Sequence, residues 1–272
     1  MLRKSMGLAA GVSAAMVLLA GVAEAAPQPW QTGFQPAVSP VMERIESFHT
    51  GVLYIITLIC LLVFALLVWI IIRYNQRRNP VPGAATHNTL LEVIWTIVPV
   101  IILVAIAIPS FKLLYYEAEI PKPDLVIKAI GKQWFWTYQY PTSGHFQFDS
   151  LGLSDAAALN KNEPRLLGVD NIVVVPVNSV VKVQTTGADV IHSWAVPAFG
   201  VKMDAIPGRI NETWFKATAE GTYYGECSEL CGARHAYMPI EVKVVSKGAF
   251  NAWLATAKKK FAAIDNDRVA AK

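Results

Sequence analysis

Two long apolar runs dominate the hydrophobic pattern of the first half of the chain. The runs Val52–Ile72 and Val93–Phe111 contain no charged residue. At a helical rise of about 1.5 Å per residue, each run is long enough to cross a hydrocarbon core of roughly 30 Å. We therefore predict a transmembrane hairpin with helices over about residues 50–73 and 90–114.

A shorter apolar run lies at the start of the chain. Arg3 and Lys4 precede the run Met6–Val22, and the small-x-small sequence Ala23–Ala25 follows it. This order is typical of an export signal that is removed after translocation. We predict a cleaved signal peptide over residues 1–25, with a third membrane helix as the alternative.

The pattern changes after Tyr116, where no apolar run is long enough to span a membrane. Short segments rich in β-branched and aromatic residues alternate with Gly, Pro and Asn, which predicts many strands and turns. Such an arrangement is typical of a β-sandwich or barrel. The segment 141–150 reads as a loop, and 248–263 as a terminal helix.

The predicted fold is thus an α+β membrane protein in which a two-helix hairpin precedes an all-β domain with a C-terminal helix. The expected domains are residues 26–116, for the N-terminal segment and hairpin, and 117–272, for the β-domain. Composition agrees, since 54% of residues are hydrophobic and only 16% are charged.

Charge sets the expected orientation. The loop between the two apolar runs carries Arg73, Arg77 and Arg78. By the positive-inside rule this loop is cytoplasmic, so the β-domain and both mature termini lie outside. This predicts a bacterial inner-membrane protein with a periplasmic domain. Basic and acidic residues of that domain nearly balance, which gives no basis for binding nucleic acid.

The stretch YYGECSELCGARHAYMP concentrates metal-binding side chains. It contains Cys227, Cys231, His235 and Met238, and the distant segment VIHSWAVP adds His192. Outside the cytoplasm the two cysteines are also compatible with a disulfide. Thiolate, imidazole and thioether together, however, are the ligands that copper sites use. The paired C-x₂-C pattern of zinc sites is absent from the sequence.

Three segments resemble motifs of one family. HSWAVPAFGVKMDAIPGR, YYGECSELCGARHAYMP and KQWFWTYQY are similar to the copper loops and the aromatic segment of cytochrome c oxidase subunit II. The resemblance implies a cupredoxin-like domain that accepts electrons from cytochrome c. It further implies transfer to the haem of subunit I, reduction of oxygen to water coupled to proton translocation, and a complex that includes subunit III.

The resemblance also implies a binuclear CuA centre and its ligands. Cys227 and Cys231 would bridge two copper ions, and His192 and His235 would each bind one of them. The weak axial ligands would be the thioether of Met238 and the backbone carbonyl of Glu229. The Glu229 side chain would reach a Mg²⁺ or Mn²⁺ ion shared with subunit I.

Four further residues gain roles from the same resemblance. Trp134 would receive electrons from cytochrome c, Asp189 and Asp204 would help to dock it, and Glu92 would lie at the cytoplasmic mouth of a proton path. On pattern alone, Trp134 is a core aromatic and Glu92 a charge at a helix N-terminus. The stretch TYQYPTSGHFQFDS holds only Asp149 as an acid, so strong charge steering of a basic donor is not expected.

Two other classes of protein stay open on the sequence. One is a membrane-anchored copper carrier or assembly factor, which needs an open site for a single copper ion. The other is a different respiratory reductase that shares the CuA loop.

Overall fold

The computed structural model describes residues 23–81 and 83–263. The chain divides into two compact units, one formed by residues 44–119 and the other by the residues on either side. The predicted signal peptide falls almost wholly outside the described residues. Only its end is seen, as strand β1 (Ala23–Ala25), which pairs in parallel with the start of β10.

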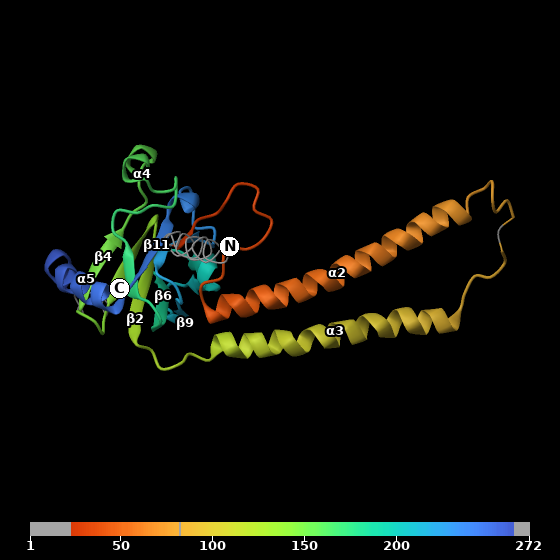
Figure 1. Cartoon of the computed structure of the whole chain (residues 1–272), viewed down its shortest axis with the longest axis horizontal. Coiled ribbons are helices and arrows are strands. Elements are labelled where there is room, and N and C mark those ends of the chain that lie inside the picture. Colours follow the sequence, from red (N-terminus) through yellow and green to blue (C-terminus); the bar gives the residue numbers. More distant parts are fainter. Residues whose placement is uncertain (1–22, 82, 264–272) are drawn as a thin grey trace, which may run out of the picture. The chain divides into compact units, whose positions relative to one another are not determined.

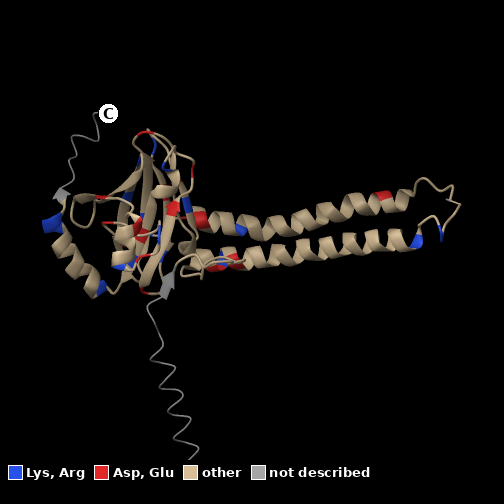
Figure 2. Cartoon of the chain, turned by 90° about the horizontal axis from the view of Figure 1, so that it is seen from above, with Lys and Arg blue, Asp and Glu red and all other residues tan. Residues whose placement is uncertain are grey.

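The unit of residues 44–119 consists of two long helices joined by a loop (Figure 1). They are α2 (Pro40–Arg73), whose first turn lies in the other unit, and α3 (Thr89–Ala118). Both are long and apolar enough to cross a membrane, which confirms the predicted hairpin. Figure 2 shows that charged residues lie near the ends of the helices and leave the middle free of charge. Asn88 caps α3 by accepting a hydrogen bond from the Leu91 amide at 3.2 Å.

The β-domain contains two six-stranded sheets. The first has the order β5-β11-β10-β7-β8, with β1 beside β10, and comprises β1, β5 (Val173–Pro176), β7 (His192–Val196), β8 (Val201–Ala205), β10 (Gly221–Cys227) and β11 (Pro239–Val245). The second has the order β12-β4-β3-β2-β6-β9 and comprises β2 (Leu125–Lys132), β3 (Phe135–Tyr140), β4 (Phe146–Ser150), β6 (Val180–Gly187), β9 (Asn211–Lys216) and β12 (Ala262–Ala263).

One core joins the inner faces of the two sheets. Strands β2 and β6 alternate between buried and half-buried residues, as expected where only one face of a sheet is covered. Trp194 of the first sheet donates a hydrogen bond from Nε1 to the Tyr138 hydroxyl of the second at 3.1 Å. The core therefore has a polar link between the sheets, and the predicted sandwich is confirmed.

Two details of the strand prediction are wrong. The apolar segment 124–140, in which no turn was predicted, forms two strands separated by a turn at Gln133 and Trp134. The segment 141–150, read as a loop, contains β4, because Phe146 and Phe148 alternate with polar residues that face outward. The short helix α4 (Asp155–Lys161) had no strong apolar pattern and was not predicted. The terminal helix is confirmed as α5 (Lys247–Lys260).

The segment before α2 packs on the β-domain rather than belonging with the hairpin. The Val38 amide donates to the Ala198 carbonyl at 3.1 Å, and the Val38 carbonyl accepts from the Thr218 amide at 2.9 Å. The Ser39 hydroxyl donates to the Phe199 carbonyl at 2.7 Å. The predicted boundary near residue 117 therefore needs a second one near Glu43, which the sequence did not signal because these contacts are distant along the chain.

Candidate metal centre

The predicted ligands lie together at one end of the first sheet. His192 is the first residue of β7, Cys227 is the last residue of β10, and Met238 directly precedes β11. Strand β10 runs antiparallel to both β7 and β11, so the end of β10 meets the starts of its two neighbours. Strand order alone therefore brings together side chains from segments far apart in the sequence.

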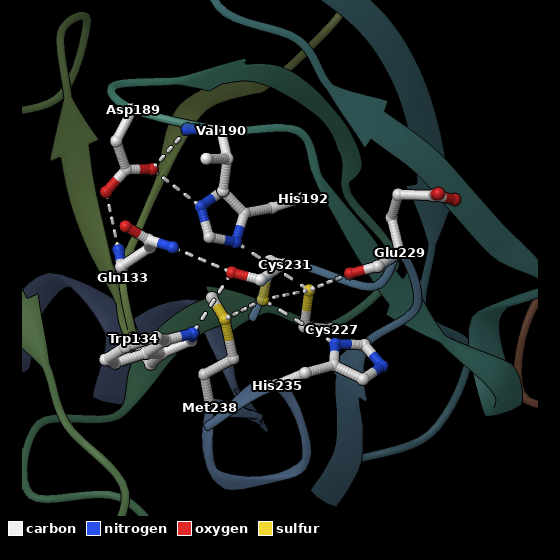
Figure 3. Close-up of polar contacts among 10 residues, drawn as sticks. All are labelled: Gln133, Trp134, Asp189, Val190, His192, Cys227, Glu229, Cys231, His235 and Met238. Carbon is white, nitrogen blue, oxygen red and sulfur yellow. Dashed lines mark hydrogen bonds and ion pairs between the residues drawn. The ribbon is translucent and has the colours of Figure 1, made fainter. Parts of the chain in front are cut away.

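The five side chains form a tight cluster around two sulfur atoms (Figure 3). The Sγ atoms of Cys227 and Cys231 are 3.9 Å apart. The Nδ1 atom of His192 lies 3.9 Å from Cys227 Sγ, and that of His235 lies 3.6 Å from Cys231 Sγ. The Met238 sulfur is 3.5 Å from Cys231 Sγ. Each thiol thus has the Nδ1 atom of a different imidazole beside it.

The backbone adds a sixth donor to this cluster. The carbonyl oxygen of Glu229 lies 3.3 Å from Cys227 Sγ, while the Glu229 side chain is exposed and points away from the sulfurs (Figure 3). The Glu229 carbonyl therefore faces the Cys227 sulfur, and its carboxylate is exposed to solvent.

The cysteines do not form the disulfide that the sequence left open. Both are free thiols, and 3.9 Å is far longer than the roughly 2.05 Å of a disulfide bond. The separation leaves room for metal ions between the sulfurs.

Burial shields the inner side of the cluster from water. His192, Cys227, Cys231 and Met238 are at most 4% exposed, whereas His235 is partly exposed. Although burial opposes ionisation of the Cys227 thiol, hydrogen bonding to the His192 ring and to backbone groups lowers its pKa. Burial and the neighbouring Cys227 raise the pKa of Cys231. Cys227 is therefore the first of the two to provide a thiolate, the form that binds metals.

Asp189 fixes the orientation of the His192 ring. Its Oδ1 lies 2.9 Å from His192 Nε2 and accepts from the Val190 amide at 2.7 Å, while Oδ2 accepts from the Gln133 amide at 2.7 Å. Partial burial opposes ionisation, but these hydrogen bonds lower the pKa of Asp189. A carboxylate on Nε2 leaves Nδ1 free to bind a metal beside Cys227. The sequence had suggested only a docking role for Asp189.

Trp134 touches the ligand loop directly. Its Nε1 donates to the Cys231 carbonyl at 3.2 Å, and the Gln133 side-chain amide donates to the same oxygen at 2.9 Å. Trp134 is half-buried, whereas the nearby Trp136 is fully buried, so only the former combines an accessible ring with contact to the cluster. Sequence reasoning missed Gln133, because nothing local marks a contact across 98 residues.

Gly131 is a second residue that the sequence did not indicate. A Cβ atom at this position would lie 2.7 Å from the His192 ring, so only glycine lets β2 approach the imidazole. On another side, the Trp136 ring contacts His192 edge-on at a centroid distance of 6.0 Å. The second sheet therefore helps to hold a ligand that the first sheet carries.

The remaining predicted residues lie outside the cluster. Asp204 is half-buried on β8, opposite Ser193 of β7, and therefore one strand away from the ligands. Glu92 lies in the first turn of α3, in the other unit of the chain.

Comparisons with known proteins all give matches to one family. Residues 27–113 match the family model described as cytochrome c oxidase subunit II, transmembrane domain, and residues 125–245 match the periplasmic domain of the same family. A probable cytochrome c oxidase subunit 2 of Rickettsia bellii (strain RML369-C) is 51% identical over 245 residues, which cover 90% of this chain and 91% of the relative. The cytochrome c oxidase subunit 2 of Cereibacter sphaeroides is 45% identical and covers 94% of this chain and 93% of its own.

A solved structure of a subunit II periplasmic domain is also similar to this chain. The periplasmic domain of subunit II of cytochrome oxidase from Bradyrhizobium japonicum is 62% identical and aligns with a TM-score of 0.50. The alignment covers 53% of this chain and all of that domain.

Proposed function

The chain belongs to the cytochrome c oxidase subunit II family, and on this premise we propose that it takes up electrons from cytochrome c and delivers them to the haem of subunit I. The cluster of two thiols, two imidazoles and a thioether carries this proposal. Matches to both domains of the family favour an oxidase subunit over a copper carrier or another CuA-containing reductase.

The donor set fits copper. Soft sulfur and imidazole ligands select this metal, and hard oxygen-seeking ions would find only one carbonyl among the inward donors. Two copper ions held by Cys227, Cys231, His192 and His235 would supply one-electron transfer. The Met238 thioether is the weaker donor and would tune the reduction potential rather than hold the metal.

The chain itself provides a rigid and largely dry frame for this chemistry. Asp189 holds the His192 ring, Gly131 admits it, and the carbonyl of Cys231 is held by two hydrogen bonds. Fixed ligands move little when charge changes, which keeps the reorganisation of the site small.

Trp134 is the residue through which we propose that electrons arrive. Two observations support this role, namely the partial exposure of its ring and its hydrogen bond to the carbonyl of the ligand Cys231. Asp189 and Asp204 would contribute negative charge to the docking of cytochrome c. Because Asp189 already accepts three hydrogen bonds at the cluster, its role in docking would be secondary to its role in orienting His192.

The partner interfaces follow from residues outside the cluster. The exposed Glu229 carboxylate is available to a Mg²⁺ or Mn²⁺ ion shared with subunit I. Three arginines at the end of α2 and in the loop after it favour a cytoplasmic position for that loop and a periplasmic position for the β-domain in a bacterial inner membrane. Glu92, in the first turn of α3, would then lie at the cytoplasmic side, where protons enter. Subunit III completes the proposed complex.

Copper counting with electron paramagnetic resonance tests the proposal. We expect two copper ions per chain and a spectrum from one unpaired electron shared by two copper nuclei. Cys231→Ser should lose that spectrum, because one bridging sulfur is gone. Cys60→Ser, which removes an exposed cysteine of α2, is the matched control and should keep it. A four-line spectrum of a single copper in the wild-type chain would contradict the proposal.

A further inference from the structure

A groove runs along the membrane hairpin, between α2 and α3. Its volume is about 380 Å³, and apolar side chains provide most of its lining. On α2 it extends from Arg44 to Ile55, and on α3 from Leu113 to Ala105. The groove is open beside Gly51, since a Cβ atom there would have no atom within 4 Å, and Pro109 lines it from α3.

The length of the groove matches one leaflet of a bilayer. From Arg44 to Ile55 the helical rise is about 16 Å, roughly half of a 30 Å hydrocarbon core. A lipid acyl chain that starts at the interface lies within one leaflet, so the length of the groove suits such a chain.

Two cations line the groove at its interfacial end. Arg44 lies on α2 and Lys112 on α3, and no acidic residue lines the groove. The Arg44 guanidinium stacks on the Tyr116 ring at 3.6 Å from its centroid. None of the ion pairs formed within residues 23–81 and 83–263 involves Arg44 or Lys112. These two charges are thus available to an anionic group.

The neighbouring acids do not line the groove. On α2 the groove residues follow a helical stripe that includes residues 44, 47, 48 and 51, and Glu43 and Glu46 fall outside that stripe. On α3, Glu117 comes one turn beyond Leu113, past the end of the groove. The hydroxyl of Ser47, which also lines the groove, adds a hydrogen-bond donor beside the cations.

We propose that this groove binds one anionic phospholipid of the outer leaflet. Its phosphate would lie between Arg44 and Lys112, and one acyl chain would follow the groove past Gly51 toward Ile55. Basic side chains are normally favoured on the cytoplasmic side of a membrane, so two of them at the outer end of the hairpin call for a local partner. The inference rests on insertion of the hairpin in the proposed orientation, and not on the copper site.

Native mass spectrometry of the full chain in detergent can test this. The chain is stripped of lipid and titrated with phosphatidylglycerol or phosphatidylcholine. We expect one tightly held phosphatidylglycerol, and a preference of about 25-fold over phosphatidylcholine, because each cation near an anionic headgroup contributes about a factor of five. An excess of inorganic phosphate should not displace the lipid, since phosphate lacks the acyl chain.

Two variants separate the contribution of the lipid headgroup from that of the acyl chain. Arg44→Gln with Lys112→Gln should abolish the preference for phosphatidylglycerol, and Arg73→Gln at the opposite end of α2 should leave it unchanged. Gly51→Leu should fill the groove and weaken retention of both lipids, with unchanged helicity by circular dichroism.

Three results would overturn the inference. They are equal affinity for the two lipids in the wild-type chain, a loss in Arg73→Gln as large as in the double variant, and unchanged lipid binding in Gly51→Leu. If Gly51→Leu instead prevented co-purification of the haem-bearing subunit while lipid binding persisted, the groove would be a protein interface. Copper content reports separately on the proposed function and should be normal in every variant.

Discussion

At the scale of single residues, the contacts of a side chain decide what its chemistry can do. Trp134 and Trp136 are two positions apart, yet one is half-buried against the ligand loop and the other is fully buried beside His192. Asp189 and Asp204 are both acids near the copper loops, yet only Asp189 bonds to a ligand. The proposed roles of these residues therefore need different measurements.

Trp134→Leu should slow reduction of the copper centre by cytochrome c by orders of magnitude. The variant removes an accessible ring that touches the Cys231 carbonyl, while the copper ligands stay in place. Stopped-flow absorbance gives the rate, and a small-molecule reductant, which can bypass the tryptophan, serves as the comparison. Equal slowing of both reductants by Trp134→Leu would mean that the ring only supports the copper loop.

Asp204→Asn, in contrast, should weaken binding of cytochrome c and flatten the dependence of that binding on salt concentration.

Glu241 is a buried acid outside the copper cluster. Its side chain is 1% exposed, and Oε2 accepts a hydrogen bond from the Val169 amide at 3.0 Å, whereas Oε1 has no partner within the described part of the chain. Burial, helped by the charge of Glu163, raises the pKa of Glu241 to about 7. A carboxyl group whose pKa is raised by folding favours the folded state at low pH, and this contribution is lost as pH rises through the folded pKa.

Glu241→Gln should therefore remove a pH dependence of stability. Near pH 5 variant and wild type should have similar free energies of unfolding, because Glu241 is then neutral. At pH 8 the variant should be more stable by about 2 kcal/mol, since one pKa unit corresponds to roughly 1.4 kcal/mol. Urea unfolding of the β-domain across this pH range gives the values. Glu220→Gln, at an exposed position, is the control, and parallel pH curves for wild type and Glu241→Gln would refute the prediction.

At the scale of elements, the copper centre depends on where strands begin and end. The end of β10 and the starts of β7 and β11 deliver the ligands, and β2 of the opposite sheet closes on His192 at Gly131. A hydrogen bond from the Ser228 amide to the Ser193 carbonyl, 3.0 Å long, ties the cysteine loop to β7. Small shifts between strands should therefore appear as loss of metal before loss of fold.

Gly131→Ala tests this connection between the sheets. The added methyl group would meet the His192 ring at 2.7 Å, so the imidazole or strand β2 must shift from its present position. We expect copper affinity to fall by about 10- to 100-fold, the usual effect of disturbing residues that orient a ligand. Gly248→Ala, where a Cβ meets nothing within 4 Å, is the control and should bind copper normally. Unchanged affinity in Gly131→Ala would show that the ring tolerates the displacement.

At the scale of the whole molecule, the two units carry different parts of the proposed function. The β-domain carries the proposed metal ligands, and the hairpin carries the apolar spans and Glu92. Because the proposed electron and proton functions lie in different units, a variant in one should leave the other intact.

Glu92→Ala is the corresponding experiment. Copper content and reduction of the copper centre should be normal, because the ligands lie in the other unit. Oxygen consumption by the purified complex should fall to a small fraction of the wild-type rate, because proton uptake from the cytoplasm would be slowed. Glu92→Asp should keep part of the activity, and Glu92→Gln less. A fully assembled Glu92→Ala oxidase with normal turnover would show that Glu92 is only a charge at the end of a helix.

The sequence by itself determined the class of the protein and brought forward the residues that we propose as its metal ligands. Uncharged runs of sufficient length specify membrane helices, because length and polarity alone decide insertion. Cys227, Cys231, His235 and Met238 lie within one short segment, so the chemistry of the site could be read locally. The strands with clear apolar alternation, β6 and β11 among them, were likewise predictable.

Only the tertiary structure decided how the site is supported. Gln133 and Trp134 reach the Cys231 carbonyl across more than ninety residues, and Gly131 meets His192 from the opposite sheet. No local pattern encodes such contacts, because strand order and sheet packing create them. The sequence did not reveal the packing of the segment before α2 on the β-domain, the hydrogen bond of Asp189 to His192 or the burial of Glu241, for the same reason. Side-chain chemistry can be read from a sequence, whereas neighbours across the fold depend on packing.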